Sequence, residues 1–294
     1  MPEQQHAVTA ADGRRLVART SGRERASALI FLTGTPSGGL VYRPLAAAAA
    51  ERGLRFVVCQ RAGYGGSTRA PGRSVADCAR DVAAVADALG IERAHVVGWS
   101  GGGPHALACA AHLPRLVASV ATIAGVAPVD AEGLDWFAGM GPENVEEFGL
   151  ALQGADAVRP FLERQADELR TLTGDQVAAA LGGLVSEVDR AALTGELADY
   201  LAAELHEAVR TGVDGWLDDD LAFARGWGFD LGKLRAPVTI WQGTEDLMVP
   251  FAHGEWLAAN VRGAAAKLLP GEGHISLVGR FGDIVDDLVA RAAG

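Results

Sequence analysis

The sequence contains little cysteine, and its cysteines form no pattern typical of metal or disulfide chemistry. Only three occur among 294 residues, each within an apolar stretch: Cys59, Cys78 and Cys109. Their odd number and wide spacing argue against a disulfide framework, and without a CxxC pair or a close His/Cys cluster no zinc site is expected. We therefore predict buried thiols in a reducing compartment, and no metal.

Long hydrophobic runs and an excess of basic charge are also missing. No stretch approaches the roughly 18 uninterrupted apolar residues of a membrane span, and the opening segment, MPEQQHAVTAADGRR, has no apolar signal-peptide region. We expect no membrane association and a cytoplasmic location. Asp and Glu total 37 against 26 Lys and Arg, and the resulting charge of -11 would repel a phosphate backbone. The expected partner is a small-molecule substrate and not nucleic acid; the oligomeric state stays open, a homodimer included.

What the sequence does contain is an alternation of buried strands and amphipathic helices. Strand-like runs occupy residues 28–34, 55–60, 94–100, 116–125, 237–243 and 265–271, and helical patterns occupy 40–53, 74–90, 102–112 and 275–293. A turn signal at Asp12-Gly13 predicts a β-hairpin over residues 6–20. The alternation predicts an α/β fold whose parallel sheet is built from βαβ units, with the hairpin as an antiparallel edge.

The pattern changes between residues 127 and 228. Strand-like runs disappear there, and segments such as DQVAAALGGLVSEVDRAAL show helical spacing, acidic faces and glycines that stop helices. We predict a helical insertion over residues 127–228 in a core formed by residues 1–126 and 229–294. Because no low-complexity linker separates it, we expect the insertion to pack over the edge of the sheet.

The stretch HVVGWSGGGPHAL, residues 95–107, places a serine between a buried strand and a helix. The three glycines after Ser100 each disfavour a helix by roughly 1 kcal/mol relative to alanine, so helix propensity did not select them. A strand, a G-x-S-x-G pentapeptide and a helix form the nucleophile elbow, a strained turn that exposes the serine hydroxyl. Glycines fit there because the strand and the helix pass too closely for a Cβ. Ser100 is therefore the predicted nucleophile.

A serine nucleophile requires a base, and the base requires an acid that orients it. Of seven histidines, only His274 lies in a glycine-rich loop, GEGH, after the last predicted strand. Such a loop brings an imidazole over the carboxyl edge of a parallel sheet. Asp246 follows strand 237–243 directly and is the predicted acid, with its neighbour Glu245 and the more distant Asp130 as alternatives.

Acyl chemistry also needs hydrogen-bond donors for an oxyanion. The N–H of Gly101, next to the nucleophile, is one candidate, and the N–H of Thr35, in the loop TGTPSGG after strand 28–34, is the other. This loop lacks the GK[ST] ending of a P-loop, and GYGGS at 63–67 lacks the G-x-G-x-x-G spacing. Neither is a nucleotide site, and no cofactor is expected.

The motifs TGTPSGG, QRAGYGGS, GWSGGGPHAL, GTEDLMVP and GEGHISL together resemble the α/β-hydrolase superfamily, in the expected order over residues 28–125 and 235–294. The order Ser100, Asp246, His274 along the chain is also that of the superfamily. The resemblance implies an α/β-hydrolase fold with a mostly parallel eight-stranded sheet flanked by helices. It also implies that the helical insertion is a cap lining the substrate pocket.

Two positions depart from the superfamily pattern. Thr33 stands where histidine is common, which implies different hydrogen bonds around the oxyanion loop, and Gln60 stands where aspartate is common, a position that we interpret as structural. The serine nucleophile separates the chain from the epoxide hydrolases and haloalkane dehalogenases of the superfamily, which attack with aspartate.

We interpret the sequence as a serine hydrolase that cleaves an ester or related acyl bond of a small, fairly apolar substrate through an acyl-enzyme on Ser100. One alternative keeps the site and changes the reaction to that of a cofactor-free C–C hydrolase, acyltransferase, perhydrolase or lyase of secondary metabolism. Another is a ligand-binding protein with a retained but slow triad. Candidate substrate-binding residues are Trp99, Trp136 and Trp216, for which packing is an equally open role.

Overall fold

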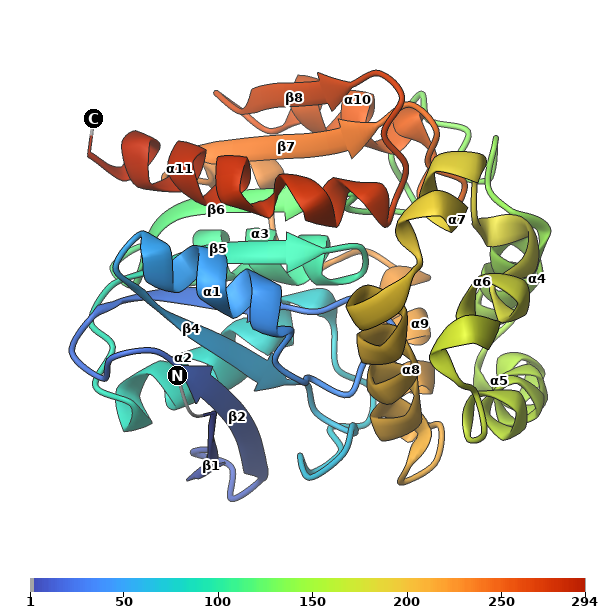
Figure 1. The fold of residues 1–294 in the computed structure, drawn as a ribbon, viewed down its shortest axis with the longest axis horizontal. Helices are drawn as coiled ribbons and strands as arrows, with labels where there is room; N and C mark the ends of the chain where they lie inside the picture. The colour runs from blue at the N-terminus through green and yellow to red at the C-terminus, as the bar shows by residue number, and fades with distance from the viewer. Residues whose placement is uncertain (1–2, 294) are drawn as a thin grey trace.

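The computed structural model describes residues 3–293, which contain one eight-stranded sheet in the order β1-β2-β4-β3-β5-β6-β7-β8 (Figure 1). The strands are β1 (Gln4–Thr9), β2 (Arg15–Ser21), β3 (Ser27–Leu32), β4 (Leu54–Gln60), β5 (Ala94–Trp99), β6 (Val117–Ile123), β7 (Val238–Gly243) and β8 (Ala265–Leu269). Neighbouring pairs from β4 to β8 are parallel, whereas β1 with β2 and β2 with β4 are antiparallel. The predicted parallel sheet with an antiparallel edge hairpin is confirmed.

Helices cover both faces of the sheet. One face packs against α1 (Arg43–Glu51) and α11 (Phe281–Ala292), and the other against α2 (Cys78–Ala88), α3 (Gly102–His112) and α10 (Phe251–Asn260). Along β3 the side chains alternate between the two cores, with Leu29 and Phe31 on the α1 side and Ile30 and Leu32 on the α3 side. Burial on both faces explains why the central strands are continuous apolar runs.

Between β6 and β7 the described chain contains helices and no strand. These are α4 (Pro142–Ala151), α5 (Ala155–Leu169), α6 (Val177–Ala180), α7 (Glu187–Ala192), α8 (Gly195–Val209) and α9 (Asp214–Phe223), with short 3-10 turns between some of them. They lie beyond the carboxyl ends of the parallel strands (Figure 1). All six fall within the predicted insertion, whose boundaries stay a prediction. No helix among residues 3–293 is long and apolar enough to cross a membrane.

Local sequence signals account for several element boundaries. Ser74 and Asp77 form a capping box ahead of α2, and Gly90 follows its end with φ 65°. The closing helical segment begins as a 3-10 turn, η5 (Ser276–Arg280), and continues as α11. As predicted, the three cysteines are buried free thiols.

Candidate active site

The loops that carry the predicted site residues meet at one edge of the sheet. Thr35 follows β3, Ser100 follows β5, Asp246 follows β7 and His274 follows β8. Because these strands are parallel, their carboxyl ends lie at the same edge. Thr35, Ser100 and His274 also line one cavity, which residues of the inserted helices close from the other side.

Ser100 occupies a strained turn between β5 and α3. Its φ of 55° lies in the left-handed region, which residues with a Cβ rarely adopt. A Cβ on Gly98 would collide with the carbonyl of Gly102, and a Cβ on Gly102 would collide with the carbonyl of Leu32. This is the close approach of strand and helix expected from the G-x-S-x-G pattern.

His274 and Asp246 form a buried pair. Nδ1 of His274 lies 2.9 Å from Oδ2 and 3.1 Å from Oδ1 of Asp246, and the two residues are only 2% and 3% exposed. Burial alone would lower the pKa of His274, but the carboxylate of Asp246 opposes this and the pKa is raised above its ordinary value. Because Nδ1 faces the carboxylate, Nε2 is the ring nitrogen left to exchange a proton.

The carboxylate of Asp246 is held by donors from its own strand and loop. The backbone N–H groups of Met248 and Val249 donate to Oδ1 at 2.9 and 2.8 Å, and the side-chain amide of Gln242 donates to Oδ2 at 3.0 Å. These bonds fix the orientation in which the carboxylate meets the imidazole.

The alternative acids and bases lie elsewhere. Glu245 and Asp130 are exposed, and Glu245 accepts a hydrogen bond from the adjacent Thr244 hydroxyl. The other histidines contact residues away from Ser100: His6 with Thr20, His95 with Ser119, His105 with Val75 and Asp219, His112 with Phe229, and His253 with Ala127 and Trp136, while His206 is exposed on α8. The structure therefore places Asp246 beside His274, and it places neither Glu245 nor Asp130 there.

The two predicted oxyanion donors are neighbours. A Cβ on Gly101 would come within 2.6 Å of Thr35 Oγ1, and a Cβ on Gly34 would come within 3.3 Å of the Ser100 Cβ. Neither the Thr35 N–H nor the Gly101 N–H donates a hydrogen bond to any atom of residues 3–293. Unpaired N–H groups beside a serine are what an oxyanion hole requires.

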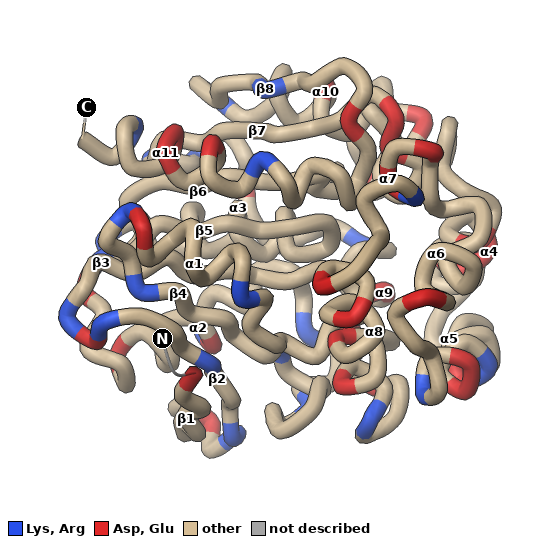
Figure 2. The backbone as a smooth tube through the Cα atoms, viewed as in Figure 1, with Lys and Arg blue, Asp and Glu red and all other residues tan. Residues whose placement is uncertain are grey.

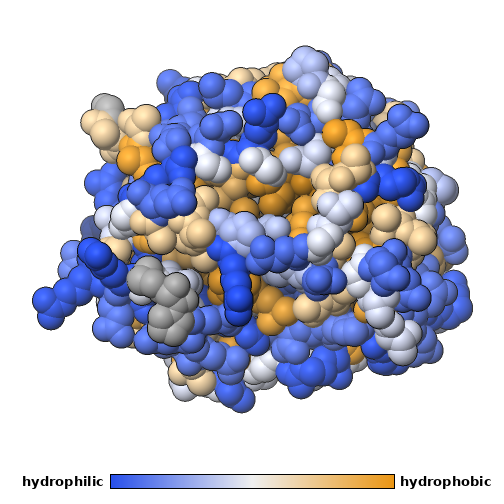
Figure 3. Space-filling view, viewed as in Figure 1, coloured by the Kyte–Doolittle hydropathy of each residue, from blue (hydrophilic) through white to orange (hydrophobic). Residues whose placement is uncertain are grey.

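The cavity encloses about 290 Å³ and has a largely apolar wall. Figure 3 shows an apolar hollow near the centre of the face that it draws. Of the predicted tryptophans, Trp99 and Trp216 line the cavity, and Trp99 Nε1 donates to the backbone carbonyl of His274 at 3.2 Å.

Trp136 does not line the cavity, and this corrects its assignment as a substrate-binding residue. Its indole packs edge-on against Phe148, and its Nε1 donates to the carbonyl of Ala127 at 2.8 Å. Phe148 itself is part of the cavity wall, so Trp136 supports that wall from behind. Its burial in a small apolar cluster of its own explains the difference.

Comparison with known proteins identifies the family. The profile of the alpha/beta hydrolase fold family matches residues 27–280. The chain belongs to this family. The prediction of an α/β-hydrolase enzyme is thereby confirmed.

Three individual proteins share between 20% and 27% sequence identity with this chain. "Putative carbamate hydrolase RutD" of Variovorax paradoxus (strain S110) is 27% identical over 249 residues, which cover 84% of each chain. The esterase EaEST from Exiguobacterium antarcticum is 20% identical with a TM-score of 0.70, covering 98% of this chain and 99% of the esterase. Epoxide hydrolase A from Mycobacterium thermoresistibile is 22% identical with a TM-score of 0.71, covering 100% of this chain and 99% of that enzyme. The two structural likenesses show a shared fold.

In this α/β-hydrolase, helix α7 of the insertion contacts the loop that carries the imidazole. The buried carboxylate of Asp189 accepts hydrogen bonds from the N–H groups of His274, Ile275 and Ser276 at 2.9, 2.8 and 2.9 Å. Asp189 thus anchors the start of η5. Sequence reasoning missed it, because SEVDRAAL has the pattern of an ordinary acidic helix face.

Helix α8 holds the loop after β3 in a similar way. Glu204 accepts hydrogen bonds from the Ser37 hydroxyl at 3.2 Å, the Leu40 N–H at 3.1 Å and the Tyr200 hydroxyl at 2.9 Å. Burial raises the pKa of Glu204 to about 7. The loop that contains Thr35 is therefore fixed just after this residue.

Gln60 braces the same loop from the sheet. Its side-chain amide donates to the carbonyl of Gly38, and its Oε1 accepts from the N–H of Gly66 at 2.8 Å. These contacts agree with a structural role for this position.

The carboxylates of the otherwise largely apolar cavity wall belong to four glutamates: Glu143, Glu147, Glu168 and Glu204. None of the described residues in the wall is a lysine or arginine. Glu147 accepts from Trp216 Nε1 at 2.6 Å, and burial raises its pKa to about 7. Figure 2 shows other acidic residues along the inserted helices. Among residues 3–293, no group of three or more His, Cys, Asp or Glu side chains is arranged to hold a metal ion.

Proposed function

We propose that the protein is a serine hydrolase that cleaves carboxylic esters or related acyl compounds through an acyl-enzyme on Ser100. The observation that carries the proposal is the shared site. A serine at a strained elbow, a histidine paired at Nδ1 with a buried aspartate, and two unpaired N–H groups lie around one edge of the sheet.

The mechanism follows from these positions. Ser100 Oγ attacks the acyl carbon while Nε2 of His274 takes the hydroxyl proton, and the Asp246 carboxylate stabilises the imidazolium. The Thr35 and Gly101 N–H groups receive the negative charge that develops on the acyl oxygen. Collapse of the tetrahedral intermediate expels the alcohol, which leaves with the proton from His274. Water then attacks the acyl-enzyme while His274 takes its proton, and collapse of the second tetrahedral intermediate returns that proton to Ser100 Oγ and releases the acid.

We propose further that residues 127–228 act as a cap and select the substrate. The cavity volume suits a small molecule, and its apolar wall favours a fairly apolar acyl or alcohol group. Four glutamates, with no lysine or arginine among the described residues of that wall, disfavour a substrate that carries its own carboxylate.

A panel of matched esters tests this proposal. Dimethyl glutarate and monomethyl glutarate share one acyl chain, and only the second carries a negative charge near pH 8. We expect the dimethyl ester to be hydrolysed with a kcat/KM roughly tenfold or more above that of the monoester, since like charges juxtaposed without water repel strongly. A methyl carbamate belongs in the panel because of the carbamate hydrolase named among the relatives. A monoester turned over as fast as the diester would contradict the electrostatic selection.

The same panel separates the alternatives. Alcohol or thiol acceptors added to the assay would divert product to a new ester if the protein is an acyltransferase, and would leave the yield of free acid unchanged if it is a hydrolase. A binding protein with a slow triad would neither turn over the panel nor react with a fluorophosphonate.

The pH dependence of kcat/KM is expected to show an acid limb above pH 6.5. Attack requires neutral His274, and the carboxylate of Asp246 outweighs burial to raise the pKa of this imidazole above its ordinary 6.5. The rate should therefore be low below the raised pKa, rise through it and level off above it. A pH series on a neutral ester measures the limb.

Three variants assign the limb, because Glu147 and Glu204 each have a pKa of about 7 and titrate in the same range. In Asp246→Asn the limb should move to lower pH, since the charge that favours imidazolium is gone. In Glu147→Gln and in Glu204→Gln it should stay in place. A limb that shifts in either glutamate variant and stays unchanged in Asp246→Asn would show that His274 is not the titrating base.

A further inference from the structure

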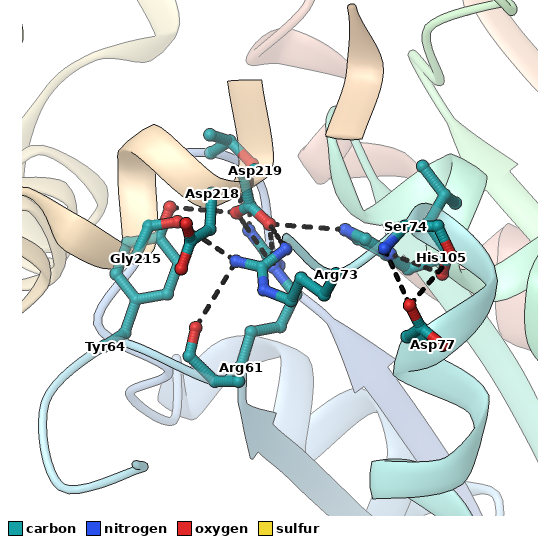
Figure 4. A network of polar contacts seen from close by, with 12 residues as sticks. Arg61, Tyr64, Arg73, Ser74, Asp77, His105, Gly215, Asp218 and Asp219 are labelled. Carbon is teal, nitrogen blue, oxygen red and sulfur yellow. Dashed lines mark hydrogen bonds and ion pairs between the residues drawn. The ribbon is translucent and has the colours of Figure 1, made fainter. Parts of the chain in front are cut away.

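A buried ionic cluster around Asp219 of helix α9 reaches the oxyanion loop. Figure 4 shows its Arg61, Tyr64 and Arg73 side chains around Asp219. At its centre, the Asp219 carboxylate is fully buried and accepts hydrogen bonds from Arg61 at 2.6 Å, Arg73 at 2.6 Å, and the hydroxyls of Tyr64 and Thr35 at 2.8 and 2.9 Å. Burial alone would raise the pKa of Asp219, but the guanidinium of Arg61, followed by that of Arg73, holds it well below its ordinary value. Asp219 is therefore ionised, and each of its two carboxylate oxygens accepts a hydrogen bond from an arginine.

Arg61 spans from this carboxylate to the oxyanion loop. Its Nη1 donates to the carbonyl of Thr33 at 2.5 Å, and its Nη2 donates to the carbonyl of Gly34 at 2.5 Å and to Thr35 Oγ1 at 2.8 Å. The Arg61 side chain thus donates hydrogen bonds to three consecutive residues of the loop, and its bond to Asp219 holds it in place.

The bond to the Gly34 carbonyl bears directly on the oxyanion donor. The Gly34 carbonyl and the Thr35 N–H belong to one planar trans peptide, in which the two groups point in opposite directions. Fixing the carbonyl toward Arg61 therefore fixes the N–H on the other side of the loop. A charged donor on the carbonyl also polarises the peptide, which makes the N–H a stronger donor.

We propose that Arg61 and Asp219 are positioning residues that aim the Thr35 N–H into the oxyanion hole, so that the inserted helix α9 completes the catalytic geometry. The inference rests on the proposed function, because an oxyanion hole has meaning only if acyl transfer occurs. It also explains how a loop with Thr33 in place of the usual histidine is braced: Arg61 binds the Thr33 backbone, and no side chain is required there.

Arg73 provides a matched control. It is also buried and also pairs with Asp219, but its remaining bonds go to the carbonyls of Ala62 and Gly215, and it makes no hydrogen bond to the oxyanion loop. Arg61→Lys and Arg73→Lys both keep a positive charge beside Asp219 and both lose guanidinium donors. Only Arg61→Lys loses guanidinium hydrogen bonds to the oxyanion loop.

The test compares kcat and KM of the two variants on a neutral ester, with urea unfolding to confirm that both are folded. We expect Arg61→Lys to lose roughly 100-fold in kcat, as for a misplaced catalytic group, while KM changes by less than about threefold. A trifluoromethyl ketone, which binds as a hemiketal oxyanion, should lose affinity in parallel with kcat. Arg73→Lys should keep kcat within about threefold of the native enzyme.

A second pair of variants keeps the test decisive if Arg61→Lys does not fold. Thr35→Val removes the hydroxyl that accepts from Arg61 and donates to Asp219 and so ties Thr35 to this pair, and Thr35→Ser keeps that hydroxyl in a smaller side chain. The valine variant should lose kcat and ketone affinity, and the serine variant should recover most of both. Equal losses in both arginine variants, or a valine variant as active as the serine variant, would overturn the inference. A native enzyme that neither hydrolyses esters nor binds the ketone would instead overturn the proposed function.

Discussion

Replacement of Ser100 by alanine is expected to lower kcat for ester hydrolysis by roughly 10³-fold or more, because it removes the hydroxyl on which the proposed acyl-enzyme forms. Folding should be retained. Alanine keeps the Cβ that already tolerates φ 55°, and the lost hydroxyl contributes little packing at the cavity surface. Thermal unfolding should therefore stay close to that of the native protein.

A double variant sharpens this result. If Ser100 and His274 act as one unit, Ser100→Ala combined with His274→Ala should be no slower than either single variant, since the second change removes a group that already has no function. Losses that multiply would mean that the two residues act in separate steps. A Ser100→Ala enzyme with a tenth of the native activity would exclude Ser100 as the nucleophile.

Replacement of Asp246 by asparagine is expected to lower kcat by on the order of 10³- to 10⁴-fold. The carboxylate accepts from His274 Nδ1 and from three other donors, and an amide in its place would offer a donor where an acceptor is needed. It would thereby favour the tautomer that carries its proton on Nε2, which cannot accept the serine proton.

Glu245→Gln is the matched control for this change. Glu245 precedes Asp246 in the chain and also loses one charge in the variant, but its side chain is exposed and accepts a hydrogen bond from the neighbouring Thr244 hydroxyl. Its kcat should stay near that of the native enzyme. The reverse ranking of the two variants would move the acid of the proposed triad to Glu245.

The sequence predicts those features that local patterns determine. The order of strands and helices follows from apolar runs and periodicity, and Ser100, Asp246 and His274 stand out because each follows a predicted strand. Glycine spacing around Ser100 reflects close backbone packing, which is a local requirement.

The features that sequence reasoning missed depend on contacts between distant segments. Asp189, Glu204 and Asp219 lie on acidic helices whose residues are usually solvated, and only the tertiary structure shows them buried against the site loops. Arg61 belongs to QRAGYGGS, one of the motifs that resemble the α/β-hydrolase superfamily, but its partner Asp219 lies 158 residues further along the chain.

Trp136 is a residue that the sequence analysis placed in the pocket wall and that the structure places behind it. A tryptophan in the insertion suggests a pocket wall, but its neighbours in space decide its role, and they place it one layer behind the wall. Composition cannot distinguish these two layers, since both are apolar and buried.

The most direct test of the account is to trap the covalent intermediate. The protein, mixed with a slowly deacylating activated ester such as p-nitrophenyl trimethylacetate and quenched in acid, is measured by intact mass spectrometry and peptide mapping. An acyl-enzyme on Ser100 predicts a mass increase of one acyl group on the peptide that contains Ser100, absent in Ser100→Ala and reduced in Asp246→Asn. Continued ester turnover with no acyl adduct, or with the adduct on another residue, would contradict it.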